Sequence, residues 1–507
     1  MLEYQLPEML RVGIEDLVLQ ILILDLGEPT SFLKKALDPP SNLALSNSLR
    51  LLEELGAVDC QWKNRKNTAF SSVREREKET EDLDVSSELT ALGFHLATLP
   101  VDPRVGKMMI YGALFGCVDP LLTFAAAMSA RSPFVAPFGQ REQADEARKT
   151  FSVAGSDHLT ILNAFNQWSE LRRTSGNRVV NDFLKDNFLG RLTLFQMEDL
   201  RKQFHSLLTD IGFLPKKFRL KDLDHACNNN SQNAGLIKAV LCAGLYPNII
   251  VAPRTVVAKP GEAPKKSDKK VGENAFRSHT KGEVYLHPST IGFNESKLDS
   301  RYCCYHELIR TSKTYVRDCT TVSPFALLLF GGTLEVFQTH GVCSVDGWLK
   351  FKIDAKPATL IKYLRGKMER LLFQKIVSPQ EDVIESEEGK ALIQSISRLF
   401  ETEEHQRREA AACIPDRRGG EIVRPWTGTE GDSDRIRAIQ EETNGRNNSS
   451  RDGIYRRQRS DNNNNNYGSG SSGDTRDNSY DSTREGRGGR GRGRRGGRSG
   501  RGRGSRR

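Results

Sequence analysis

This 507-residue sequence lacks the apolar segments that would place it in a membrane or on a secretory route. No apolar run reaches the roughly eighteen residues that a membrane-spanning helix needs. The longest candidate, residues 12–26, is interrupted by Glu15, Asp16 and Gln20. The N-terminus has no basic region followed by an apolar core and a small-residue cleavage site, so we predict no signal peptide. We therefore expect a protein of the cytoplasm, the nucleus or both, with no membrane partner.

Cysteine is present, but in no pattern typical of metal binding. The nine cysteines are scattered, and none forms a CxxC pair. Cys303 and Cys304 are adjacent, a spacing that suits neither a shared disulfide nor ordinary zinc coordination. Reduced thiols in a reducing compartment are the simpler interpretation. We predict no metal site.

Excess charge of either sign is missing outside one segment. The net charge is +10, and residues 484–507 alone hold eleven arginines and a single acidic residue, Glu485. The rest of the chain has 64 basic and 64 acidic residues and is neutral. The excess positive charge therefore belongs to one polyelectrolyte arm and not to a uniformly basic surface.

Hydrophobic periodicity predicts helices and one short strand in the first part of the chain. A helix from about Ile14 to Leu22 has apolar residues at helical spacing. A second begins after Ser41 as N-cap and ends at Gly56. Residues 57–60 then resemble a strand, and residues 63–87 form a charged insertion. Helices followed by a β-wing favour a winged-helix domain over residues 1–87, although a helical bundle fits the composition as well.

The middle of the chain changes from helical to strand periodicity. Residues 88–227 are predicted to form a helical bundle, with helices beginning near Val105 and Pro120 and further helices over residues 160–168 and 194–208. After Asn248 the apolar period falls towards two. Short strands separated by turns favour a small β-barrel with a flanking helix over residues 228–380. The predicted strands are residues 249–252, 284–286, 315–317 and 326–330, with a Lys/Pro/Gly-rich loop at 259–270.

After the barrel we expect further helices, and after those helices a disordered segment. Residues 350–376 have a helical apolar side, and we assign residues 381–415 to a helical extension. Residues 416–507 consist of asparagine, Gly-Ser and Arg-Gly stretches that cannot bury a core. We predict a disordered tail.

The Arg-Gly repeats of the tail are a nucleic-acid signal in their own right. Arginine offers a planar fork to phosphates and stacks on bases, while glycine keeps the backbone flexible. We predict direct RNA contact. A solubilising, localisation or methylation tail without RNA contact is the alternative. The arginines predicted to contact RNA are Arg487, Arg490, Arg492, Arg494, Arg495, Arg498, Arg501 and Arg503.

Several segments in series resemble one protein family. They are residues 6–11 (LPEMLR), 89–106 (LTALGFHLATLPVDPRVG), 156–160 (SDHLT) with Trp168, 233–247 and 284–332. In this order they resemble the winged helix, the ratchet-like helicase-associated domain and the OB-fold of the C-terminal region of DEAH/RHA-type RNA helicases. The resemblance covers residues 2–380. It implies an α+β multidomain fold whose ratchet and OB-fold line an RNA exit channel beneath an ATPase motor.

Cations and hydroxyls gather at one turn of the predicted barrel. Arg310, Thr311, Ser312, Lys313 and Arg317 lie in a strand-and-loop context in which such side chains can contact phosphates. The resemblance puts them near the RNA channel. For any one of them, a salt-bridged barrel surface is the alternative.

Other polar residues of these segments are interpreted as structural. His287 and His306 have no evident partner nucleophile, so we expect packing or hydrogen-bonding roles. Asp102 and Arg104 flank a proline, and we predict an ion pair or a helix cap there. We assign no catalytic residue.

The main departure from the family pattern is that the motifs of the helicase motor are not found in this sequence. The phosphate loop, GxxxxGK followed by Ser or Thr, does not occur. Residues 145–148 (DEAR) differ by one letter from the DEAH motif, but they fall in a polar, helix-forming stretch and not after an apolar strand. We interpret them as a solvated helix face. ATP and magnesium are expected only for a full-length parent.

Together these observations predict an RNA-binding C-terminal accessory region of a DEAH/RHA-type RNA helicase. It would clamp single-stranded RNA for a motor absent from this chain. The alternative is a genuine short, non-enzymatic RNA-binding or scaffold protein of a ribonucleoprotein. The expected partners are RNA, single-stranded or structured, and ribonucleoprotein or helicase-cofactor proteins.

Overall fold

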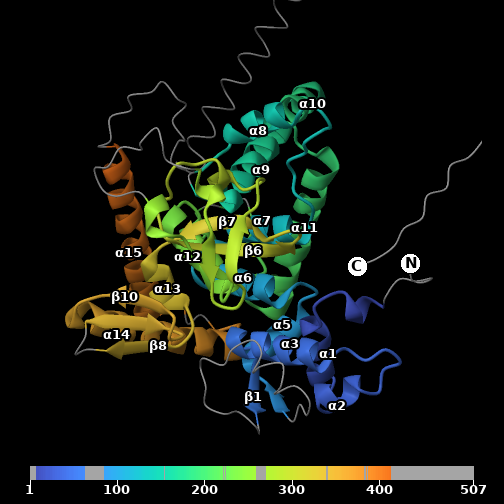
Figure 1. Cartoon of the computed structure of the whole chain (residues 1–507), viewed down its shortest axis with the longest axis vertical. Helices are drawn as coiled ribbons and strands as arrows, with labels where there is room; N and C mark the ends of the chain where they lie inside the picture. Colours follow the sequence, from blue (N-terminus) through green and yellow to red (C-terminus); the bar gives the residue numbers. More distant parts are fainter. Residues whose placement is uncertain are drawn as a thin grey trace, which may run out of the picture. The chain divides into compact units, whose positions relative to one another are not determined.

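The computed structural model describes residues 7–62, 85–153, 155–220, 222, 224–257, 270–337, 341–381, 384 and 386–412. Within these ranges, helices make up most of the first half and a five-stranded barrel follows (Figure 1). All of these residues belong to one compact unit, residues 1–444. In the part that is described, no helix combines the length and the apolar composition needed to cross a membrane.

Short helices and a hairpin form the N-terminal part. The Ser41 hydroxyl starts α3 by accepting a 3.1 Å hydrogen bond from the backbone N–H of Ala44, and Gly56, at φ +75°, ends it. Both ends lie where the sequence predicts them. Strands β1 and β2 pair antiparallel, with Val58 opposite Leu89. The elements are η1 (Glu8–Leu10), α1 (Glu15–Ile23), α2 (Pro29–Leu33), α3 (Asn42–Leu55), β1 (Val58–Trp62), β2 (Val85–Leu89) and α5 (Ala91–Thr98).

The charged insertion is predicted over residues 63–87, but its last three residues belong to a strand. Residues 63–84 lie outside the described residues, but residues 85–87 are the first part of β2. Their serines carry no hydrophobic signal for a strand. The strand is stabilised instead by a polar contact, since Ser86 and Ser87 both donate hydrogen bonds to the Glu28 carboxylate.

A helical bundle follows, as the sequence predicts. Its helices are α6 (Pro103–Leu114), α7 (Val118–Ser129), α8 (Arg141–Lys149), α9 (Asp157–Thr174), α10 (Asn177–Asp186), α11 (Arg191–Ile211), η2 (Ala226–Asn228) and α12 (Ala234–Leu245). Every residue of α12 except Gly235 is buried. This helix packs against α6, α13 and α15, so it is the apolar centre on which the bundle and the later elements meet.

The barrel is closed in the strand order β3-β4-β5-β7-β6. All neighbouring strands run antiparallel except β5 and β7, which are parallel. Its interior is filled by apolar side chains that include Ile250, Phe276 and Val316. The elements are β3 (Ile249–Val251), η3 (Arg254–Val256), η4 (Val271–Glu273), β4 (Phe276–Ser278), β5 (Gly282–Leu286), η5 (Ile291–Phe293), β6 (Tyr302–Arg310) and β7 (Thr314–Val322).

One predicted barrel strand is wrong. Residues 326–330 belong to a helix, α13 (Pro324–Phe330), whose start is capped by the Ser323 hydroxyl. The helix is buried from Ala326 to Phe330, so its sequence is apolar all round and shows no helical period. Such a short apolar run cannot be told from a buried strand by periodicity alone.

A second predicted boundary, the start of a helix at residue 350, is also wrong. A three-stranded antiparallel sheet in the order β10-β9-β8 precedes the long helices, and Lys350, predicted as helix, lies in β10. The helix begins only at Ala355. The elements are β8 (Leu334–Phe337), β9 (Val342–Val345), β10 (Leu349–Lys352), α14 (Ala355–Val377) and α15 (Glu387–Ala412).

Candidate nucleic-acid interface

The hairpin of β6 and β7 holds the five barrel residues that the sequence singles out. Its tip is closed by a 2.9 Å hydrogen bond from the backbone N–H of Thr311 to the carbonyl of Lys313. Arg310, Thr311, Ser312 and Lys313 are exposed there, whereas Arg317 is half-buried farther along β7. The predicted strand-and-loop setting is confirmed, with residues 310–313 at or next to the exposed tip and Arg317 in the strand that follows it.

The strand register divides these residues between two faces. Val316 is fully buried in the barrel core, so its neighbours in the alternation, Tyr315 and Arg317, point outward with Lys313. Arg310 pairs with Thr314, which lies on the same side of the strand as Val316 and on the opposite side from Tyr315 and Arg317. Lys313 and Arg317 thus share a face that Arg310 does not.

Aromatic rings complete the face of Lys313 and Arg317. Tyr285 of β5 lies beside Tyr315 in the parallel register, with ring centroids 6.3 Å apart. The ammonium of Lys313 lies 4.1 Å from the centroid of the Tyr285 ring. His287 meets Tyr315 edge-on at 6.1 Å. We call Tyr285, His287, Lys313, Tyr315 and Arg317 the hairpin face. Its cations next to partly exposed rings are the combination that single-stranded nucleic acid requires.

The aromatic residues of this face are not among the site residues predicted from the sequence. The signal for Tyr315 was present, because it alternates with Lys313 and Arg317 at the period of a strand. Tyr285 gave no such signal, since its place beside Tyr315 depends on the parallel closure of the barrel.

A carboxylate already engages one of the predicted phosphate ligands. The guanidinium of Arg317 lies 3.1 Å from the Glu307 carboxylate, directly opposite in the hairpin. Arg317 thus makes the surface ion pair that the alternative interpretation predicts. Lys313 makes a ring contact in place of an ion pair within the described residues, so it is the less engaged of the two cations.

His287 links the hairpin face electrostatically to the helical bundle. Burial, followed by the charges of Arg317 and of Arg141 at the start of α8, lowers the pKa of His287. Its Nδ1 accepts hydrogen bonds from the hydroxyl and the backbone N–H of Ser289. The predicted hydrogen-bonding role of His287 is confirmed. Nδ1 of His306, by contrast, has no hydrogen-bond partner among the described residues.

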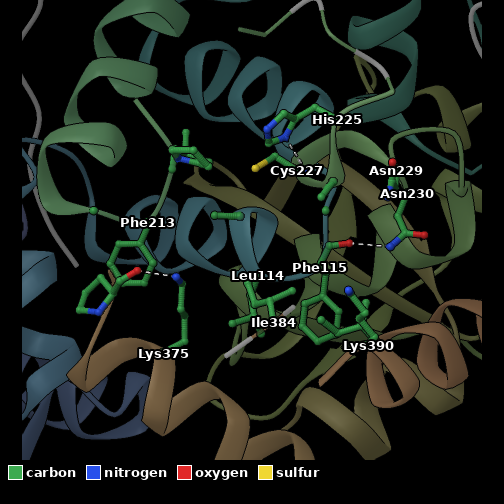
Figure 2. A pocket seen from close by; sticks show the side chains of 18 of the residues that line it. Leu114, Phe115, Phe213, His225, Cys227, Asn229, Asn230, Lys375, Ile384 and Lys390 are labelled. Carbon is green, nitrogen blue, oxygen red and sulfur yellow. Dashed lines mark hydrogen bonds between the residues drawn. The ribbon is translucent and has the colours of Figure 1, made fainter. Parts of the chain in front are cut away.

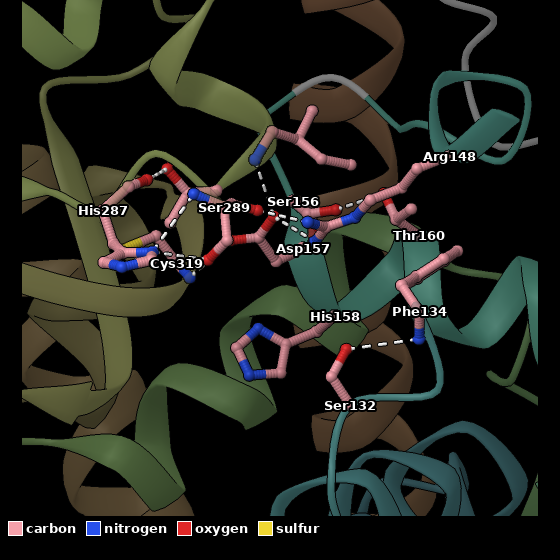
Figure 3. Close-up of polar contacts among 12 residues, drawn as sticks. Ser132, Phe134, Arg148, Ser156, Asp157, His158, Thr160, His287, Ser289 and Cys319 are labelled. Atoms are coloured by element: carbon pink, nitrogen blue, oxygen red, sulfur yellow. Dashed lines mark hydrogen bonds and ion pairs between the residues drawn. The ribbon is translucent and has the colours of Figure 1, made fainter. Parts of the chain in front are cut away.

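A buried carboxylate joins the bundle to the barrel (Figure 3). Asp157, the first residue of α9, is 1% exposed. Its Oδ1 accepts hydrogen bonds from the backbone N–H of Ile291 at 2.8 Å and from Arg148 at 3.2 Å, and its Oδ2 accepts one from the backbone N–H of Cys319 at 2.9 Å. Arg148 also donates to the carbonyl of Ser289. Burial raises the pKa of Asp157 to about 6 despite the Arg148 charge.

Neighbouring hydroxyls extend this junction. The hydroxyl of Thr320 in β7 lies 2.9 Å from the hydroxyl of Ser156 and 2.8 Å from Nδ1 of His158. Ser156 in turn caps α9, since its hydroxyl accepts a hydrogen bond from the backbone N–H of Leu159. These contacts fix α9 against β7, and with it the position of the hairpin face relative to α8.

Two further structural predictions concern Asp102 and the DEAR segment. Asp102 caps α6 by accepting a 2.8 Å hydrogen bond from the backbone N–H of Arg104, and the two side chains form an ion pair at 2.5 Å. Cap and ion pair are both confirmed. Asp145 of the DEAR segment lies in the polar helix α8, with 48% of its side chain exposed and paired with Arg141 at 3.9 Å. Asp145 and Glu146 thus lie on the solvated helix face that the sequence predicts, whereas Arg148, the last residue of the segment, turns inward to Asp157 with only 15% of its side chain exposed.

A cavity of about 920 Å³ lies elsewhere, between the ends of α6, α11 and α14 and the start of α15 (Figure 2). Phe115 and Phe213 form part of its apolar wall, but their side chains are only 1% and 4% exposed. The ammonium of Lys375 donates hydrogen bonds to the carbonyls of Pro379 and Glu381. Neither phenyl ring is thus open for a base to stack on.

The other predicted contacts lie outside the described residues, among them all of the tail arginines from Arg487 to Arg503. Within the described residues, no three His, Cys, Asp or Glu side chains gather in a way that could hold a metal ion.

Known families match three consecutive parts of the chain. Residues 102–161 match the ratchet-like helicase-associated domain (HA2), and residues 237–334 match the oligonucleotide/oligosaccharide-binding (OB)-fold. Residues 341–402 match the C-terminal domain in RNA helicases. The hairpin face lies within the OB-fold match, and Asp157 lies in the HA2 match.

Similar whole proteins are considerably longer. The chain is 38% identical over 405 residues to the DExH-box ATP-dependent RNA helicase DExH1 of Arabidopsis thaliana, which covers 80% of this chain and 36% of that protein. It is 39% identical over 380 residues to the human ATP-dependent DNA/RNA helicase DHX36, covering 74% of this chain and 34% of that protein. For the human ATP-dependent RNA helicase DHX29 the identity is 35% over 404 residues, covering 79% and 27%. The chain thus spans about a quarter to a third of the length of these relatives. In sequence and in domain content, the chain corresponds to the C-terminal region of DEAH-type RNA helicases.

Proposed function

We propose that this chain grips single-stranded RNA through the hairpin face and passes the strand to the ATP-dependent motor that its relatives' names imply. The observation that carries the proposal is the pair Tyr315 and Arg317 along one side of β7, with Lys313 in the turn before the strand and Tyr285 beside them. A cation attracts the phosphates, and the rings accept bases of any sequence.

The rigid junction at Asp157 supports a clamp more than a flexible tether. RNA that contacts both the barrel and the bundle needs the two held in a fixed relation, because loose positioning weakens every contact. Asp157, Arg148 and Thr320 supply that relation through buried hydrogen bonds.

Two finer assignments belong to the same proposal. The N-terminal helices α1 and α3 with the hairpin of β1 and β2 form the winged helix. The Arg-Gly segment, residues 484–507, adds a sequence-independent electrostatic grip, since its eleven arginines carry the net positive charge of the chain.

RNA binding by the intact chain and by residues 1–483, titrated with salt, tests the function. A single-stranded RNA of mixed sequence is the probe, and fluorescence anisotropy is the readout. If the whole chain neutralises about six phosphates, the logarithm of the binding constant should fall with a slope near −4 against the logarithm of salt concentration. Truncation at residue 483 should flatten the slope but leave measurable binding from the hairpin face. Absence of RNA binding by the intact chain at low salt would overturn the proposal.

A further inference from the structure

The loop that joins α7 to α8 presents an unusual side chain to solvent. Phe138 is 106% exposed, which means that its ring touches almost nothing else. Among the exposed apolar side chains of the described residues only Leu37, at 102%, is comparable. The next aromatic residue, Phe373, is 64% exposed. Leaving a phenyl ring in water forgoes the burial that normally stabilises it.

The loop is nevertheless well anchored at its base. The backbone N–H of Val135 donates to the carbonyl of Phe188 at 2.9 Å, and the backbone N–H of Gly190 donates to the carbonyl of Pro133 at 2.8 Å. The Phe134 ring turns inward, where the Arg148 guanidinium lies 4.9 Å from its centroid (Figure 3). The exposure of Phe138 therefore does not come from a loop without contacts.

A tight turn holds Phe138 at the tip. The backbone N–H of Gln140 donates to the carbonyl of Pro137 at 3.1 Å, which closes a four-residue turn. Gly139 occupies the third position at φ +80°, the conformation that a type II turn demands there and that favours glycine. The turn fixes the backbone of Phe138 so that its ring projects outward.

One cation lies close to this ring in the sequence and also acts on the hairpin face. Arg141 follows Phe138 by three residues, so their Cα atoms are at most roughly 11 Å apart. Arg141 is also one of the charges that lower the pKa of His287 on the hairpin face. The acidic neighbour Asp145 engages Arg141 only at 3.9 Å and near the surface, which is a weak pairing. Arg141 is thus a cation that follows Phe138 closely in the chain and acts on His287 of the hairpin face.

We propose that Phe138 is a stacking platform for an unpaired base of the RNA strand that the hairpin face binds. This inference rests on the proposed function. An exposed ring with a cation close by matches the way in which proteins hold single strands without reading their sequence. A paired base inside a duplex is stacked on its neighbours and cannot offer its face to the ring. Phe138 therefore makes the chain prefer single-stranded RNA to duplex.

The experiment compares the full-length chain with its variants Phe138→Ala and Phe138→Trp, and with Leu37→Ala as the matched exposed control. The probes are a single-stranded RNA carrying 2-aminopurine at successive positions and a blunt duplex of the same sequence. Phe138→Ala should weaken single-strand binding about 5- to 150-fold, which corresponds to one stacked base. Duplex binding should stay unchanged. Phe138→Trp should restore the affinity, and Leu37→Ala should have no effect.

The fluorescence of 2-aminopurine separates stacking from other roles of the ring. One probe position should be quenched by the unaltered chain and released in Phe138→Ala. If the unaltered chain binds RNA but Phe138→Ala binds it equally well, this inference fails while the proposed function stands. An equal loss for single strand and duplex would also overturn it, as it would point to a structural role or to protein docking. If the unaltered chain binds no RNA, both proposals fall together.

Discussion

The carboxylate of Asp157 accepts a 2.9 Å hydrogen bond from the backbone N–H of Cys319, and this contact joins the first turn of α9 to strand β7. The other carboxylate oxygen of Asp157, Oδ1, accepts hydrogen bonds from the backbone N–H of Ile291 and from the Arg148 guanidinium. A carboxylate suits this place because both of its oxygens only accept, and three donors converge on it. Burial works against the charge, as the raised pKa of Asp157 shows.

Replacement of Asp157 by Asn should loosen the junction. The amide keeps one accepting oxygen, so its NH₂ group must face one of the two backbone N–H donors. We expect Asp157→Asn to lower the free energy of unfolding by about 1–3 kcal/mol, and Asp157→Ala to lower it by about 3–5 kcal/mol because Arg148 then loses its buried partner. Urea denaturation measures both. The exposed Asp145→Asn is the matched control, and an equal effect in it would contradict the assigned role.

The buried imidazole of His158 should make stability depend on pH. Burial lowers its pKa to about 4, whereas an unfolded histidine titrates near 6.5. Between these values the unfolded chain binds the proton and the folded chain does not, so stability is lost as the pH falls from 6.5 towards 4. The loss attributable to His158 amounts to about 3 kcal/mol at most.

Asp157 acts in the opposite direction over nearly the same range. Its pKa is raised to about 6, so the folded chain keeps that proton longer than the unfolded chain and gains stability as the pH falls from 6. Only a comparison isolates His158. The difference in unfolding free energy between the unaltered chain and His158→Gln should shrink between pH 7 and pH 4.5 in urea titrations. A difference that does not vary with pH would refute the assignment.

Much of the fold was predictable because its signals are local. Ser41 and Gly56 mark the ends of α3, and Asp102 marks the start of α6, since caps and turns involve residues close in sequence. The alternation around Val316 likewise predicts β7. Helix α13 was not predictable in this way, because burial on every side removes the polar residues that would reveal its period.

The site was predictable only in part, for a related reason. Lys313 and Arg317 stand out as cations at a turn, but Tyr285 joins them only through barrel closure. Asp157 binds the barrel through backbone N–H groups of Ile291 and Cys319. Backbone donors exist at every residue except proline, so they leave no mark in a sequence that could identify the partner.

Lys313 and Tyr315 should contribute to RNA binding in separable ways. Lys313→Ala removes one phosphate contact, so we expect weaker binding and a salt slope flatter by about 0.7. Tyr315→Ala removes a ring surface, so we expect weaker binding by about 1–3 kcal/mol with the slope unchanged. Arg310→Ala, on the other side of the hairpin, is the control and should change less than Lys313→Ala. Anisotropy titrations at several salt concentrations measure all three, and identical slopes for Lys313→Ala and Tyr315→Ala would argue against this division.

Glu307 should restrain the hairpin face, and its neutralisation should strengthen RNA binding. Its carboxylate lies 3.1 Å from the guanidinium of Arg317 and competes with phosphates for that cation. Glu307→Gln keeps the size of the side chain and removes the charge, so Arg317 becomes available. Because the pair is partly exposed, its loss should cost at most about 1 kcal/mol of stability. The salt slope for single-stranded RNA should steepen by about 0.7, as expected for one additional phosphate contact.

The double variant Glu307→Gln with Arg317→Ala should lose this gain, since the freed cation is then absent. If Glu307→Gln binds RNA more tightly even without Arg317, the gain comes from general charge reduction, and Arg317 is a structural residue of the barrel surface.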